Sequence, residues 1–77
     1  MMKIYEFIRN HNVKTDYDQF TGFVVSAPSE EEAKDLVAYR MTSYFQEPEI
    51  TVEDFEVYVV GTSEIEKRIV LQQYNAG

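Results

Sequence analysis

Carboxylates are the groups in this chain with the widest capacity for chemistry. Asp16-Tyr17-Asp18 places two of them close together, as a hard cation requires, but a calcium loop needs more oxygen ligands and the EF-hand spacing is absent. His11 is the only histidine, so a metal site or a catalytic triad in this chain can contain no more than one imidazole. We interpret both features as parts of a solvated loop, with a weak general base at His11 as the open alternative.

Phosphate-binding and nucleophilic patterns are missing from the sequence. The three glycines stand alone at positions 22, 61 and 77, which is not the spacing of a phosphate loop. Side chains that could act as nucleophiles have no activating partner in sequence: Lys14, Thr15, Ser26, Thr62 and Ser63. The sequence therefore predicts a protein that is not an enzyme, with no catalytic, cofactor or metal site.

Two groups of acidic residues are candidates for a protein-binding surface. One lies in the predicted helix and the other around the predicted third strand. If they join into one surface, they can imitate a polyanion and occupy a basic groove on another protein; otherwise they form an ordinary solvated surface. With the loop carboxylates and one tyrosine that can anchor an interface, the predicted protein-binding residues are Asp16, Tyr17, Asp18, Glu31, Asp35, Glu53, Asp54 and Glu56.

Length and composition predict one domain over residues 1–77. The chain has 77 residues, a formal charge of −7 and no cysteine, so disulfides and thiolate zinc sites are excluded. Such acidity argues against direct nucleic-acid binding, which needs clustered Lys and Arg. No apolar run approaches the roughly 20 residues of a membrane span, and we expect a cytoplasmic protein with no membrane partner.

The stretch from Phe20 to Tyr44 organises the predicted fold. Phe20 to Ala27 has the alternation of a strand, and Pro28 ends it. Ser29 and Glu32 form a capping box, after which apolar residues follow at helical spacing. The core-facing stripe of this helix is predicted to be Ala33, Leu36, Val37, Arg40, Met41 and Tyr44.

Three further strands complete the prediction. Lys3 to Arg9 carries apolar groups on both faces, so this strand is central or its second face meets a partner chain. Ile50 to Val60 is the third strand, closed by Gly61. For the tail we favour a helical turn near Glu64 to Lys67, because Ser63 and Glu66 match a second capping box, followed by a fourth strand from Arg68 to Tyr74. The fold class is α+β, ββαββ with a four-stranded antiparallel sheet and one helix on one face; ββαβα, with a helical tail, is the runner-up.

Several of these segments together resemble a family of very small proteins. They are Y-D-Q-F-T-G-F-V-V-S-A-P-S-E-E-E-A-K-D-L, the V-V-G that ends the third strand, and the terminal I-V-L-Q-Q-Y-N-A-G. The similar proteins are encoded mainly by bacteriophages and prophages, and the resemblance covers about Tyr17 to Gly77. The chain differs from their pattern at Pro28 and at Arg68-Ile69, where a glycine-containing turn is expected. The resemblance implies a phage accessory role, which includes inhibition of host defence, and transfers no activity to particular residues.

Three functional interpretations follow. The leading one is a small acidic binding protein that engages a host protein, including an inhibitor of a defence system. The second is a structural or self-associating module, a homodimer formed through sheet edges or through the second face of the first strand. The third is a protein that sequesters a small molecule, or a nucleic-acid mimic.

Overall fold

The computed structural model describes residues 1–10, 19–44 and 51–75. Two strands, a helix, a short 3-10 turn and two more strands follow in order. Their bounds are β1 (Met2–Arg9), β2 (Gln19–Ala27), α1 (Glu30–Tyr44), η1 (Val52–Asp54), β3 (Phe55–Ser63) and β4 (Arg68–Asn75). The ββαββ prediction is confirmed.

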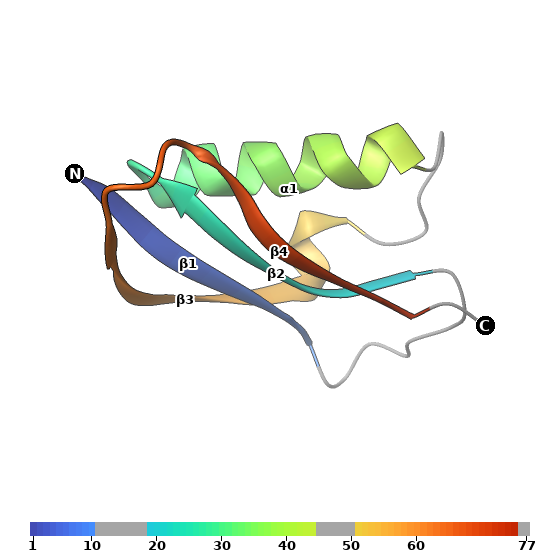
Figure 1. The fold of residues 1–77 in the computed structure, drawn as a ribbon. Helices are drawn as coiled ribbons and strands as arrows, with labels where there is room; N and C mark the ends of the chain where they lie inside the picture. Colours follow the sequence, from blue (N-terminus) through green and yellow to red (C-terminus); the bar gives the residue numbers. More distant parts are fainter. Residues whose placement is uncertain (11–18, 45–50, 76–77) are drawn as a thin grey trace.

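The four strands form one antiparallel sheet in the order β3-β1-β2-β4. The first two strands are therefore central, and the last two occupy opposite edges. Helix α1 lies on one side of this sheet (Figure 1). A β-strand exposes alternate residues on its two faces, so covering one face leaves the other to solvent or to a partner.

The core lies between α1 and the sheet. Its strand residues alternate in sequence, as the pattern predicts: Tyr5, Phe7, Phe23, Val25, Ala27 and Phe55 are all buried. The rings of Phe23 and Phe55 pack at 5.7 Å between centroids, and the guanidinium of Arg9 lies 6.0 Å from the Phe55 ring centre. Aromatic area thus supplies much of the buried surface of a small domain.

Helix α1 begins where the capping box predicts. The Glu32 backbone N–H donates to the Ser29 hydroxyl oxygen at 3.2 Å, and that hydroxyl lies 3.4 Å from the Glu32 carboxylate. Ala33, Val37 and Met41 are buried, whereas Leu36 and Arg40 are half-buried at the sides of the stripe. Arg40 reaches across to β4, where its Nη1 donates to Gln72 Oε1 at 3.1 Å. The side chain of Tyr44 lies outside the described residues.

The structure corrects the predicted helical turn near Glu64 to Lys67. Residues 64–67 form no helix, because this segment crosses from the β3 edge to the β4 edge past the ends of both central strands (Figure 1). Four residues that span such a gap cannot contract into a helix, which rises only about 1.5 Å per residue. The Ser63 hydroxyl instead accepts from the Ile65 N–H at 2.8 Å, in place of the predicted cap.

The predicted start and end of the third strand are also corrected. Val52–Asp54 forms η1 rather than strand, and β3 runs from Phe55 past Gly61 to Ser63. The Asp54 carboxylate accepts from the Thr51 N–H at 2.9 Å, a local bond that competes with strand pairing. Gly61 does not end the strand because it stays paired with Ile4.

Truncation of Met41 tests the core. Met41 is 3% exposed and Tyr39, on the outer side of the same helix, is 75% exposed. We expect Met41→Ala to lower the free energy of unfolding by about 2–5 kcal/mol, through lost burial and a cavity. Tyr39→Ala should change it by less than about 0.5 kcal/mol. Urea denaturation of both variants measures the difference, and equal losses would contradict the described packing.

Removal of the helix cap gives a second stability prediction. Ser29→Ala leaves the Glu32 N–H without its acceptor and should destabilise the domain by about 1 kcal/mol. Ser29→Asp keeps an acceptor at the same place and should stay close to the wild type. Thermal unfolding followed by circular dichroism compares the two, and an unchanged midpoint for Ser29→Ala would show that the cap is dispensable.

Candidate functional site

The predicted protein-binding residues that the structure describes do not gather into one site. Asp16, Tyr17 and Asp18 lie outside the described residues. Glu31 and Asp35 are exposed in the first half of α1, whereas Glu53 and Asp54 belong to η1. Glu56 directly follows the buried Phe55, so it points to the side of the sheet that lacks the helix. The helical carboxylates and Glu56 therefore face different sides of the molecule.

Several acidic side chains have structural partners. Asp54 binds Thr51 through its carboxylate, and its backbone carbonyl accepts from the Asn10 N–H at 2.8 Å. Glu30 pairs with Lys34 at 3.3 Å, and Glu32 pairs with Lys67 at 3.4 Å. The Glu32–Lys67 pair ties the helix to the crossing segment between β3 and β4, although exposed pairs such as this one contribute little stability.

The side of the sheet away from α1, here called the helix-free face, carries the most unusual surface of the described residues. Residues that pair directly across antiparallel strands share a face. The strand register therefore gives three rows across β3, β1, β2 and β4: Glu56, Ile8, Gly22 and Gln73; Tyr58, Glu6, Val24 and Leu71; Gly61, Ile4, Ser26 and Arg68. Every strand contributes one residue to each row.

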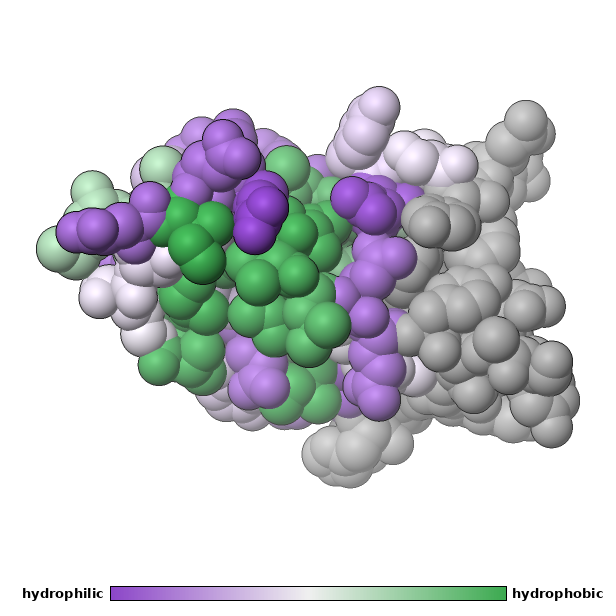
Figure 2. Space-filling model, viewed as in Figure 1, coloured by the Kyte–Doolittle hydropathy of each residue, from purple (hydrophilic) through white to green (hydrophobic). Residues whose placement is uncertain are grey.

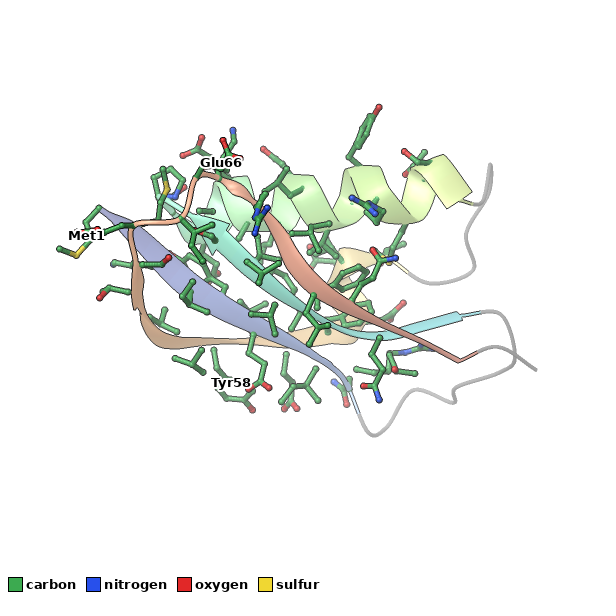
Figure 3. The ribbon with its side chains drawn as sticks, in the orientation of Figure 1. Met1, Tyr58 and Glu66 are labelled. Carbon is green, nitrogen blue, oxygen red and sulfur yellow. The ribbon has the colours of Figure 1, made fainter. Side chains whose placement is uncertain are left out.

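Apolar side chains dominate the middle of the helix-free face. Leu71 is 64% exposed, Tyr58 47% and Ile8 42%, while Ile4 and Val24 are half-buried beside them. Figure 2 shows this face as a continuous apolar area with hydrophilic residues around it. Tyr58 extends from the β3 edge, away from the helix (Figure 3). Contiguous exposed patches of this kind on small proteins mark interaction surfaces, whereas single exposed apolar residues do not.

A depression interrupts the helix-free face at Gly22. It measures about 150 Å³, and its walls include Ile8, Val24, Leu71 and Gln73. The depression exists because Gly22 has no side chain: a Cβ there would lie 3.1 Å from the Phe7 carbonyl oxygen and 3.7 Å from Gln73 Oε1. The β2–β4 register also shifts between Phe20 and Gly22, an irregularity of the kind that a glycine within a strand often marks.

Charges on the helix-free face are separated along a diagonal. Glu56 occupies the end of the first row on the β3 edge, and Arg68 occupies the end of the third row on the β4 edge. Glu6 lies between them in the middle row and is half-buried. The face thus has an acidic corner, a basic corner and one carboxylate within the apolar area.

Ser26 anchors one end of this face. It is fully buried, and its hydroxyl donates to the Ile65 carbonyl at 2.9 Å, which holds the crossing segment against β2. The hydroxyl is therefore a satisfied structural group rather than a nucleophile. Within the described ranges, no three His, Asp or Glu residues lie close enough to hold a metal ion.

Comparisons with protein-family models, curated proteins and solved structures found no match to this chain. The one α-helix among the described residues is too short and too polar to cross a membrane.

Sequence reasoning found part of the helix-free face. The apolar residues on both sides of β1 indicated a second surface around Ile4 and Ile8. Leu71, Gln73 and Arg68 were missed, since their place beside β2 depends on long-range pairing, and that of Arg68 also depends on a register shift between Leu71 and Ile69. The signal in the sequence was the pair of consecutive apolar residues Val70 and Leu71. In a strand with one covered face, two consecutive side chains cannot both be covered, and both are exposed here.

Substitution of Ser26 tests whether the crossing segment depends on this hydroxyl. We expect Ser26→Ala to cost about 1 kcal/mol, the usual worth of one hydrogen bond. Amide exchange should accelerate at residues 64–70 more than in β1. Thr21→Ala removes a longer, exposed bond to the Gln73 carbonyl at 3.4 Å and is the control with a smaller effect. Equal exchange in both variants would contradict an anchoring role.

Proposed function

We propose that this chain is a non-enzymatic protein-binding module that associates with other proteins through the helix-free face of its sheet. The observation that carries the proposal is the apolar area formed by residues of all four strands on the side of the sheet away from α1. The centre of an interface is mainly apolar and its rim is polar, which is the arrangement of this face except for Glu6 in its middle row.

The composition of the face favours a protein over a small molecule. Its apolar residues spread over three rows, and the depression at Gly22 takes up only one end of them. Leu71 and Tyr58 are the exposed side chains best placed to act as anchors, while the depression can receive an anchor from the partner. Glu6, Glu56 and Arg68 add polar contacts that select the orientation.

The resemblance to small bacteriophage-encoded proteins supplies the biological setting of the proposal. It points to an accessory protein in the host cytoplasm whose eventual target is a host protein, including a component of a defence system. The acidic residues on the outer side of α1, Glu31 and Asp35, remain exposed for such a target when the helix-free face is occupied.

Affinity purification with a matched pair of variants tests the proposal. Leu71→Asp places a charge in the apolar area, whereas Tyr39→Asp places one on the exposed side of α1. A tagged wild-type chain expressed in bacteria, together with an untagged copy, should retain at least one protein partner, either that copy or a host protein. We expect Tyr39→Asp to retain it and Leu71→Asp to reduce it by on the order of tenfold or more.

The comparison requires that both variants are folded, and circular dichroism of each variant measures whether they are. Both substituted side chains are exposed, so neither should unfold the domain. A set of retained proteins that is the same for Leu71→Asp and the wild type would overturn the assignment of this face.

A further inference from the structure

We infer that the helix-free face is occupied by a second copy of this chain, in a twofold dimer whose two sheets cross at about a right angle. The inference rests on the proposed protein-binding function of this face and names its partner. The charges and the depression are placed asymmetrically on the face, so they favour one orientation of the two copies.

The size of the face suits a dimer. Its four strands have eight or nine residues each. With strands about 4.8 Å apart and a rise of about 3.3 Å per residue, the face measures roughly 19 by 28 Å, so two crossed copies overlap over roughly 370 Å² each. The two copies then bury roughly 740 Å² in total, which is the size of a weak, concentration-dependent dimer rather than of a permanent one. A small domain whose described residues form one α-helix also gains buried apolar area from a second layer over the other face of its sheet.

Charge placement selects the crossed orientation. In a twofold interface, a residue that contacts a second position is contacted by that position in return. An axis along the diagonal from the Gln73 corner to the Gly61 corner exchanges the other two corners. Glu56 then faces the partner's Arg68, and Arg68 faces the partner's Glu56, so two opposite-charge pairs form. The strands of the two sheets cross near 90°, which is one of the two usual packing angles of sheets.

Other twofold axes in the plane of the face do not pair these charges. An axis along the Glu56–Arg68 diagonal sets each charge against its own copy, which is repulsive. Axes parallel or perpendicular to the strands set Glu56 and Arg68 against the uncharged Gln73 and Gly61 corners. Since each copy has a net charge of −7, association is opposed at long range, and the two reciprocal pairs decide the orientation.

The same axis also brings complementary shapes on the two copies together. It carries Leu71, the most exposed aliphatic residue of the middle row, to a point between the partner's Ile8 and the partner's Gly22. The depression lies there, and its volume of about 150 Å³ resembles that of the roughly 150 Å³ cavity that accepts a benzene-sized group. One operation therefore places a protruding side chain over a depression and opposite charges over each other.

The axis also brings the two copies of Glu6 near each other at the centre of the interface. Substitution of this carboxylate distinguishes a second copy of the chain from a basic partner on the same face. Against a second copy it meets a like charge, so Glu6→Gln should tighten association. Against a basic partner it meets an opposite charge, so the same substitution should weaken association.

Sedimentation equilibrium of the full chain from 1 to 200 µM is the test. We expect a monomer–dimer equilibrium that Leu71→Asp abolishes and Tyr39→Asp leaves unchanged. Arg68→Glu and Glu56→Arg should each raise the dissociation constant by on the order of tenfold, because repulsion replaces attraction at two places. The double variant Glu56→Arg with Arg68→Glu should return to within about threefold of the wild type, because the exchanged charges pair again.

The outcomes separate this inference from the proposed function. A chain that stays monomeric to 200 µM, yet loses a host protein on Leu71→Asp, overturns the dimer and supports the proposed function. A dimer that resists Leu71→Asp associates elsewhere, such as through the strand edges, and overturns the dimer through this face; the proposed function is overturned as well only if no host protein is lost on the same substitution. A dimer that requires Leu71 but is not rescued by the charge exchange, or that Glu6→Gln weakens, overturns the crossed orientation.

Discussion

Packing of a single helix on a four-stranded sheet is the constraint on which the rest of the structure depends. The stripe of Ala33, Val37 and Met41 is narrow, and it buries the alternate residues of the two central strands. One helix has no second stripe with which to cover the other face of the sheet. The helix-free face is thus a direct consequence of the element order, and its character depends on the residues that the strands place there.

Those residues do not follow the usual polar pattern of a solvated sheet face. Ile4, Ile8, Val24, Tyr58 and Leu71 would each be unremarkable alone, since exposed apolar residues are common. The sheet order makes them neighbours, although they come from the beginning, the middle and the end of the chain. Their proximity, rather than their composition, turns a scaffold into a candidate interface.

Irregular strand register makes the surface of the helix-free face uneven. The β1–β3 pairing shifts between Ile4 and Tyr5, and the β2–β4 pairing shifts on both sides of the Gly22–Val24 segment. These shifts, and the missing side chain at Gly22, create a depression beside the protruding Leu71. Bulges re-aim neighbouring side chains and increase local twist, so a surface built on them has a defined shape rather than a flat one.

Local pattern in the sequence determined the elements, and tertiary structure decided their neighbours. The Ser29–Glu32 cap, the helical stripe and the alternation at Phe23, Val25 and Ala27 were all readable, because each depends on residues within a few positions. The Ser63–Glu66 match failed for the opposite reason. The chain had to cross between opposite edges of the sheet there, and that long-range demand outweighs a local cap. The helix-free face was only partly predictable on the same grounds: strand order, register shifts and the diagonal placement of Glu56 and Arg68 arise only when segments more than 40 residues apart pair.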